Sequence, residues 1–322
     1  MESKPTVLIL NPPVVYLLHK SLLSRHFNFI NARDSPLPLY EFLAAGNAAG
    51  VTAMLTNNNT PITREGVLRH LPALRCIVNT SAGTDHIDLA ECRRRGIAVA
   101  YGGAVYSDDC ADLTVGLLLD VLRKISAADR FVRSGAWETR RKYPLGNRLG
   151  GKKVGIVGMG NIGSRVAKRL EAFGCSLSYT SRKQKMSVSY PFCSDVHELA
   201  AKVDVLVLCC ALTDQTTCMI DKDVLSALGK DGIIINIARG SILDEKELVK
   251  CLVEGKIAGA GLDVFENEPD VPKELLGLDN VVLSPHIGCC TPESFDNMAD
   301  HVIANFQAFF SGKPLLSPVG ED

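Results

Sequence analysis

Short apolar runs alternate with helix-forming stretches along most of the chain, and this alternation limits the possible folds more than any other feature. A first series of strands is expected at residues 7–10, 51–55, 76–79 and 97–100. A second series begins at Lys153, with strands expected at residues 154–157, 176–180, 205–208, 233–237, 259–262 and 281–283. Strands that alternate with helices are typical of parallel sheets with helices packed on them. We therefore expect an α/β fold of two doubly wound parallel-sheet domains, Rossmann-like or flavodoxin-like, with an inter-domain cleft.

The chain length and the helical patterns indicate where the domains divide. A chain of 322 residues is long enough for about two domains. Leucine and valine recur at helical spacing over residues 107–134, and residues 135–151 form a polar, glycine-rich loop or arm. A final helix is expected at about residues 292–310, returning to the first domain. The first domain would then comprise residues 1–102 and 290–322, and the second residues 103–289.

Composition excludes several classes of protein and partner. The formal net charge of −1 provides no field that would attract nucleic acid or anionic lipid. The eleven cysteines are scattered without a CxxC pair, so we expect reduced thiols and no metal site. No apolar run reaches the roughly 18 residues of a membrane span. With neither a secretory leader nor a Ser-Lys-Leu tail in the sequence, the expected location is the cytoplasm.

A glycine-rich segment follows the first strand of the second series. Gly158, Gly160 and Gly163 form a GxGxxG motif between that strand and a helical run. The first glycine permits a tight turn, the second lets the backbone approach a pyrophosphate, and the third lets helix and strand pack closely. The motif therefore predicts a dinucleotide site in the second domain, formed by this turn with its remaining residues Met159, Asn161 and Ile162. The alternative is a strand-to-helix turn that binds no ligand.

The turn after the next strand predicts which dinucleotide binds. An NAD site carries a carboxylate at this point to bind the ribose 2′-hydroxyl. This chain instead has Ser181, Arg182 and Lys183, a hydroxyl and two cations that suit a 2′-phosphate. We therefore expect NADP(H), with weaker use of NAD(H). The alternative is a solvated basic turn.

Three polar stretches in the second half follow expected strands, and open α/β sheets bind ligands beyond the carboxyl ends of strands. Reduction of a 2-oxo acid needs a cation for the carboxylate and keto oxygen, a proton donor, and a carboxylate that keeps the donor protonated. Arg239, His286 and Glu268 can fill these three roles. Each alone could be a capping cation, a core histidine or a surface carboxylate. Their occurrence together after a GxGxxG motif favours the catalytic interpretation.

These stretches together resemble the D-isomer-specific 2-hydroxyacid dehydrogenases. The resemblance covers most of the chain, including residues 81–88, 109–119, 151–163, 235–247, 261–269 and 284–288. It implies that Arg239 binds substrate and that Glu268 and His286 form the acid–base pair. The other implied site residues are Asp263 at the nicotinamide carboxamide, Ile237, Ala238 and Gly288 at the cofactor, and Ser81, Ala82 and Gly83, which with Arg239 and His286 bind the substrate.

Within this family the chain is most similar to plant hydroxypyruvate/glyoxylate reductases and hydroxyphenylpyruvate reductases. The expected reaction is NADPH-dependent reduction of hydroxypyruvate or glyoxylate to D-glycerate or glycolate. Two alternatives remain. The substrate could be an aromatic 2-oxo acid, which would require a larger pocket near residues 55–58 and the arm. Alternatively, the chain could be a nucleotide-sensing corepressor.

The resemblance also implies a homodimer with residues 107–151 at the contact. Trp137 would pack in that interface or reach the partner's substrate pocket. Cys289 and Cys290 depart from the family pattern, and we expect them to be inert or, alternatively, sensitive to oxidants.

Overall fold

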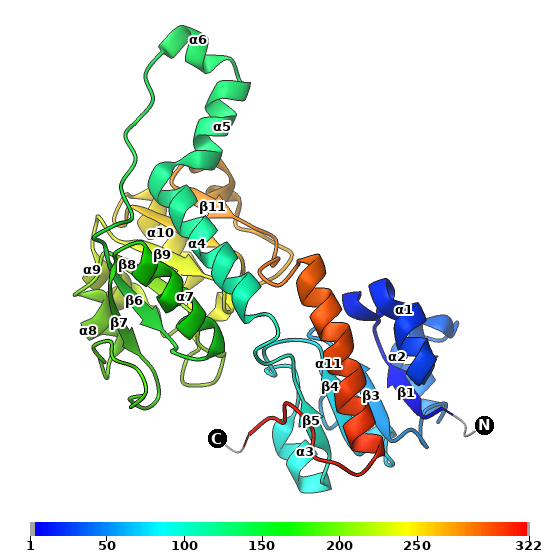
Figure 1. Cartoon of the computed structure of the whole chain (residues 1–322). Coiled ribbons are helices and arrows are strands. Elements are labelled where there is room, and N and C mark those ends of the chain that lie inside the picture. The colour runs from blue at the N-terminus through cyan, green and yellow to red at the C-terminus, as the bar shows by residue number, and fades with distance from the viewer. Residues whose placement is uncertain (1–3, 321–322) are drawn as a thin grey trace. The chain divides into compact units, whose positions relative to one another are not determined.

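The computed structural model describes residues 4–320. It contains two sheets, and every pair of neighbouring strands in them is parallel. The chain forms two compact units (Figure 1). Unit 1 contains residues up to Tyr106 and from Cys290 onward, and unit 2 contains Ser107–Cys289. The expectation of two parallel-sheet α/β units is confirmed. Residues 1–3 and 321–322, which belong to the termini considered for a leader and a tail, lie outside the described residues.

Unit 1 has a five-stranded sheet in the order β2-β1-β3-β4-β5. Its strands are β1 (Thr6–Ile9), β2 (Asn28–Asn31), β3 (Ala53–Thr56), β4 (Cys76–Asn79) and β5 (Ala98–Ala100). Its helices are α1 (Val14–His26), η1 (Ala32–Asp34), α2 (Leu39–Ala44), η2 (Leu68–His70), α3 (Leu89–Arg95) and α11 (Pro292–Phe310). The residues of β3 and β4 are all buried, which explains why these strands are continuous apolar runs.

Helices α1 and α11 lie side by side and run in the same direction, although they come from opposite ends of the chain (Figure 1). Near their N-terminal ends His19 pairs with Asp296, and near their C-terminal ends Gln307 contacts His26. Helix α11 begins with a capping box formed by Thr291 and Ser294. The final helix therefore completes the unit that contains the chain's first strand.

Unit 2 has a six-stranded sheet in the order β11-β10-β9-β8-β6-β7. Its strands are β6 (Lys153–Val157), β7 (Ser176–Thr180), β8 (Val205–Leu208), β9 (Ile233–Asn236), β10 (Gly259–Leu262) and β11 (Val281–Leu283). Its helices are α4 (Ser107–Arg123), α5 (Ile125–Arg133), α6 (Ala136–Arg140), α7 (Asn161–Ala172), α8 (Val196–Ala200), α9 (Lys222–Leu228), η3 (Gly240–Ile242), α10 (Glu245–Val253) and η4 (Lys273–Gly277). Because the strands are parallel, the loops after β6, β7, β9, β10 and β11 all lie at one edge of this sheet.

The structure corrects the predicted elements in three places. Strand β2, a half-exposed edge strand without an apolar run, was not predicted. The helix predicted over residues 107–134 is broken at Lys124, which has a left-handed backbone with a φ of 56° and separates α4 from α5. The predicted loop at residues 135–151 contains the short helix α6. Among the described residues, no helix is long and apolar enough to cross a membrane.

Candidate active site

The glycine turn after β6 is tightly packed at two of its three glycines. Gly158 has a φ of 96°, and a Cβ atom there would lie 2.6 Å from the backbone nitrogen of Cys210. A Cβ atom at Gly163 would lie 2.1 Å from the carbonyl oxygen of Gly158. Both positions therefore exclude a side chain for reasons internal to the protein. Met159 is buried in the core of unit 2.

Gly160 differs from these two glycines, because a Cβ atom there would meet nothing within 4 Å. It precedes α7, whose first N–H groups have no partner inside the helix and carry a partial positive charge. The next residues, Asn161 and Ile162, are exposed and half-buried. Open space beside a helix N-terminus fits the pyrophosphate of a dinucleotide. These residues therefore fit the predicted cofactor.

The turn after β7 lies beside the glycine turn, since Thr180 pairs with Val157 and accepts a 2.9 Å hydrogen bond from the Gly158 N–H. Ser181 donates its hydroxyl to the carbonyl oxygen of Lys183 at 2.8 Å. Arg182 and Lys183 are exposed. The turn therefore carries two exposed cations and no carboxylate.

The Arg239 loop follows β9 and is held by a buried amide that the sequence analysis left without a role. Asn236 accepts from the Ala238 N–H at 3.0 Å and donates its side-chain amide to the Arg239 carbonyl oxygen at 2.9 Å. A Cβ atom at Gly240 would lie 1.9 Å from the carbonyl carbon of Phe265, so this loop is pressed against the turn that follows β10. The Arg239 guanidinium donates to the Ala238 carbonyl oxygen at 2.7 Å. The sequence signal that could have indicated Asn236 was its position at the end of an apolar strand.

Glu268 and His286 are in direct contact, with 2.8 Å between the carboxylate Oε2 and the imidazole Nδ1. The other carboxylate oxygen accepts from the Phe265 N–H at 3.1 Å. About a third of each side chain is exposed, 35% for Glu268 and 31% for His286. Burial is the largest single influence on the pKa of the Glu268 carboxyl, and it raises this pKa because it opposes ionisation. The His286 hydrogen bond and charge, the Phe265 N–H and the Arg239 charge outweigh burial, so the pKa of Glu268 lies below its ordinary value.

Asp263 anchors the loop that carries His286. Its carboxylate accepts from the Ser284 hydroxyl at 2.6 Å and from the Ile287 and Gly288 N–H groups at 2.9 Å each. The His286 N–H donates to the Asp263 carbonyl oxygen at 2.8 Å. His286 itself has a φ of 53°, an uncommon backbone for a non-glycine residue. Asp263 therefore acts as a positioning residue, a role that the sequence analysis did not predict.

The loop after β4 contains the residues expected to bind the substrate carboxylate. The Ser81 N–H donates to Asn79 Oδ1 at 3.2 Å, and the Asn79 amide donates to the Gly83 carbonyl oxygen at 2.8 Å. The Ser81 hydroxyl accepts from the Asn58 N–H at 3.2 Å. Asn79 thus shapes the backbone around Ala82, and it too was missed.

The structure brings Arg239, Glu268 and His286 to one edge of unit 2, after the neighbouring strands β9, β10 and β11. Ile237 and Ala238 lie on the same side after β9, and Gly288 lies two residues beyond His286. Together with the glycine turn, this edge has the arrangement of a nicotinamide-dependent dehydrogenase.

Cys289 is half-buried and Cys290 is exposed. Cys209 and Cys210 follow β8 at the edge that carries the glycine turn, and burial raises the pKa of the Cys210 thiol to about 11. Cys210 therefore remains a neutral thiol at physiological pH.

Comparison with known proteins identifies the class more closely. Residues 115–288 match the family model "D-isomer specific 2-hydroxyacid dehydrogenase, NAD binding domain". The glyoxylate/hydroxypyruvate reductase HPR3 of Arabidopsis thaliana is 52% identical over 100% of this chain and 99% of its own length. A hydroxyphenylpyruvate reductase of Plectranthus scutellarioides is 45% identical over 97% of this chain and 98% of its own. The chain belongs to the D-isomer-specific 2-hydroxyacid dehydrogenase family.

A solved structure agrees with this assignment. The NADPH-dependent glyoxylate/hydroxypyruvate reductase of Sinorhizobium meliloti, in complex with NADP and malonate, superposes with a TM-score of 0.89 at 34% identity. The match covers 99% of this chain and 97% of that one. The expected family is confirmed, and its members are oxidoreductases that use a nicotinamide cofactor.

Replacing Glu268 with glutamine should lower the rate of reduction. The pKa of Glu268 lies below its ordinary value, so at neutral pH the carboxylate carries a negative charge beside His286 Nδ1. Glutamine has a similar shape but no charge, and losing a charge-assisted hydrogen bond of about 1.5–3 kcal/mol corresponds to a fall in kcat/KM of roughly 10- to 100-fold. Glu266→Gln, an exposed neighbour, is the control. Equal kcat/KM for Glu268→Gln and the unmodified protein would contradict this role.

Proposed function

We propose that this protein reduces a small 2-oxo acid, glyoxylate or hydroxypyruvate, to the D-2-hydroxy acid (glycolate or D-glycerate) with NADPH. The observation that carries the proposal is the 2.8 Å contact between Glu268 and His286 with the Arg239 charge beside it. Bound NADPH would supply a hydride to the keto carbon and leave as NADP⁺. Because Nδ1 of His286 faces Glu268, its Nε2 is the atom that donates the proton to the keto oxygen. A C–H bond and an O–H bond form as the carbonyl is reduced.

The residues proposed to bind the substrate lie in two loops, each described within its own unit. Arg239 would hold the carboxylate and keto oxygen and offset negative charge as it develops. Because the Ser81 N–H already donates to Asn79, we assign the loop's remaining contacts with the carboxylate to the Ala82 and Gly83 N–H groups. Residues 1–102 with 290–322 would then bind substrate, and residues 103–289 would bind cofactor. Asp263 would meet the nicotinamide carboxamide while anchoring the His286 loop.

A substrate panel tests this function. Oxidation of NADPH, followed by absorbance, should be fastest with glyoxylate or hydroxypyruvate, slower with pyruvate, and dependent on enzyme concentration. The 45% identical relative from Plectranthus scutellarioides favours hydroxyphenylpyruvate as a second candidate substrate, so it belongs in the panel. Absence of turnover with every 2-oxo acid would refute the proposal and favour a nucleotide-sensing protein.

The preference for NADPH over NADH should reverse when Arg182 is replaced with aspartate. Arg182 and Lys183 are exposed beside the glycine turn, where a 2′-phosphate would receive charge-assisted hydrogen bonds. Loss of about 1.5–3 kcal/mol of such interaction raises the KM for NADPH roughly 10- to 100-fold. The exposed Lys230, replaced with aspartate, is a charge-matched control because it precedes β9 and lies at the opposite edge of the sheet. Equal kcat/KM for NADPH and NADH in the unmodified protein would refute the preference.

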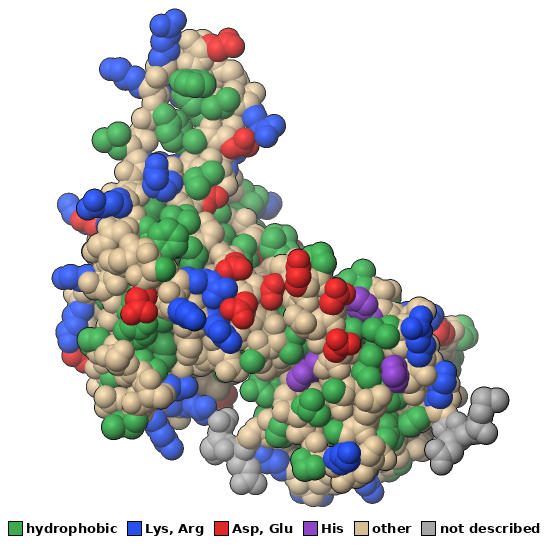
Figure 2. Space-filling view, in the orientation of Figure 1, with side chains coloured by type: hydrophobic (Ala, Val, Ile, Leu, Met, Phe, Trp, Pro, Cys, Tyr) green, Lys and Arg blue, Asp and Glu red, His purple; other side chains and the backbone are tan. Residues whose placement is uncertain are grey.

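We also propose a homodimer that uses the arm formed by α5, α6 and the segment up to Arg148. Figure 1 shows the arm extending from α4 away from the sheet of unit 2, and Figure 2 shows hydrophobic side chains on it. Trp137 is 59% exposed and Leu145 is 93% exposed, which is costly for apolar groups in a monomer. Sedimentation should give a dimer that Leu145→Glu weakens. We further propose a reducing compartment such as the cytoplasm, where free thiols like these eleven cysteines stay reduced.

A further inference from the structure

The segment that follows the cationic turn (residues 181–183) folds back onto a tyrosine of the strand before it. Tyr179 is the next-to-last residue of β7, and its side chain is fully buried, with 0% exposed. The Lys185 N–H donates to the Tyr179 hydroxyl oxygen at 2.9 Å, and the hydroxyl donates to the Lys185 carbonyl oxygen at 3.4 Å. A buried hydroxyl needs such partners. The polar end of the ring therefore fixes the backbone six residues later in the chain.

Tyr179 is itself held in place on all sides. Its backbone pairs with Ile156 of β6 in the sheet. Its N–H donates to the Pro191 carbonyl oxygen at 3.0 Å, and its carbonyl oxygen accepts from the Cys193 N–H at 2.8 Å. Its ring packs against Phe192, with 5.4 Å between the ring centroids. The hydroxyl is therefore a fixed point in the core of unit 2, to which the exposed segment is tied.

The cationic turn is consequently anchored at both ends. At its beginning, the Thr180 carbonyl oxygen accepts a 2.9 Å hydrogen bond from the Gly158 N–H of the glycine turn. At its far end, the Tyr179 hydroxyl holds the backbone of Lys185. Only residues 181–184 lie between these two anchors, so both cations of the turn are carried by a short, closed piece of backbone.

Anchoring affects binding because the cations Arg182 and Lys183 are exposed. Ordering a mobile segment around a ligand costs conformational entropy, and this cost lowers affinity. A turn whose backbone is already fixed avoids most of that cost. The gain applies to the contacts that the turn makes, and in the proposed complex these are with the 2′-phosphate of NADPH, a group that NADH lacks.

We propose that Tyr179 is a positioning residue for cofactor specificity, whose hydroxyl holds the cationic turn in the arrangement that receives a 2′-phosphate. The inference rests on the proposed preference for NADPH and deepens it. Because its side chain is fully buried, Tyr179 acts through the backbone of Lys185 and not by contact with the cofactor. Its effect is therefore confined to the dinucleotide that carries the phosphate.

The decisive variant is Tyr179→Phe, which removes the hydroxyl and keeps the buried ring against Phe192. We expect kcat/KM for NADPH to fall about threefold to tenfold and kcat/KM for NADH to change less than about twofold. A purely structural role would lower both alike. Calorimetry should show a weaker Kd for 2′,5′-ADP, which carries the 2′-phosphate, and an unchanged Kd for 5′-AMP, which does not.

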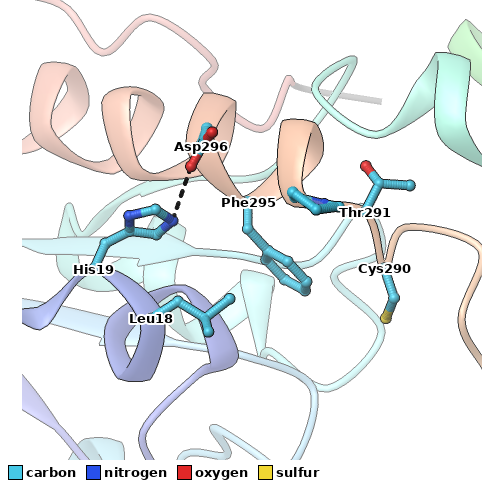
Figure 3. A pocket seen from close by; sticks show the side chains of 7 residues that line it. Leu18, His19, Cys290, Thr291, Phe295 and Asp296 are labelled. Carbon is cyan, nitrogen blue, oxygen red and sulfur yellow. Dashed lines mark ion pairs between the residues drawn. The ribbon is translucent and has the colours of Figure 1, made fainter.

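Two variants control for the loss of a contact elsewhere. Tyr143→Phe removes another hydroxyl that donates to a backbone carbonyl oxygen, that of Lys124 at 3.4 Å, in the arm. Asp296→Asn removes the charge that pairs with His19 between α1 and α11 in unit 1 (Figure 3). Neither should change the ratio of kcat/KM for NADPH to that for NADH by more than about twofold.

A double-mutant cycle tests whether Tyr179 acts through the cations. In Arg182→Asp the turn has lost its attraction for the phosphate, so adding Tyr179→Phe should change kcat/KM for NADPH less than about twofold. Equal losses with NADPH and NADH in Tyr179→Phe, no loss with either, or additive losses in the double variant would overturn the inference and leave the preference for NADPH standing. Equal kcat/KM for the two dinucleotides in the unmodified protein would refute that preference and the inference with it.

Discussion

His286→Ala should reduce kcat for glyoxylate or hydroxypyruvate by roughly 10²- to 10⁴-fold, the contribution of a positioned general acid. Nδ1 of the His286 imidazole lies 2.8 Å from the Glu268 carboxylate, which leaves Nε2 for the substrate. Without it, the keto oxygen must take its proton from water while the hydride arrives. Steady-state kinetics with saturating NADPH measure the effect on kcat.

The control for this prediction is His197→Ala, which removes an exposed histidine of unit 2 on α8. It should retain full activity. The Kd for NADPH, measured by fluorescence, should be similar in both variants, because His286 is proposed to act on the substrate. A His286→Ala protein with kcat within a few-fold of the unmodified protein would show that another group supplies the proton.

The second large effect is expected from alanine at Gly163 and Gly160, two glycines of one motif that should fail in different ways. At Gly163 the new Cβ atom would lie 2.1 Å from the Gly158 carbonyl oxygen, so Gly163→Ala should lower the free energy of unfolding by about 1–3 kcal/mol or more. At Gly160 the φ of −88° accepts alanine, and beyond the adjoining residues of the chain no described atom lies within 4 Å of the new Cβ atom. Gly160→Ala should therefore fold normally but raise the Kd for NADPH at least tenfold, since the backbone must approach the pyrophosphate.

Thermal unfolding without cofactor, followed by NADPH titration, separates these outcomes. Gly163→Ala should lose several degrees in Tm, whereas the Tm of Gly160→Ala should stay within about 2 °C of the unmodified protein. The two variants serve as controls for each other. If Gly160→Ala binds NADPH as tightly as the unmodified protein, then the space beside Gly160 does not receive the pyrophosphate.

Much of the fold could be predicted because both faces of most strands are buried. Strands such as β8 and β9 consist almost entirely of apolar residues, and their continuous apolar runs contrast with the polar turns that follow. Strand β2 was not predicted because it lies at a sheet edge and has two apolar residues between two asparagines, too short an apolar run to stand out. The break at Lys124 also had no signal, since neither glycine nor proline marks it and the apolar spacing continues across it.

The candidate site was predictable where a residue type reveals its chemistry. Arg239, Glu268 and His286 could be proposed together because a 2-oxo acid reductase needs a cation, a carboxylate and a proton donor. The residues that shape their loops could not. Asn236 and Asn79 are ordinary amides in the sequence, and only the structure shows that each holds a turn by bonding to backbone groups.

The left-handed backbone of His286 restricts which residues evolution or an engineer could place there. Only glycine adopts this conformation freely, and asparagine and aspartate tolerate it better than other residues, whereas valine, isoleucine or threonine would strain the loop. Few residue types could therefore replace the proposed proton donor, and among those that tolerate this backbone, histidine is the side chain whose ordinary pKa lies near neutral pH. Backbone geometry and acid–base chemistry thus select the same amino acid independently.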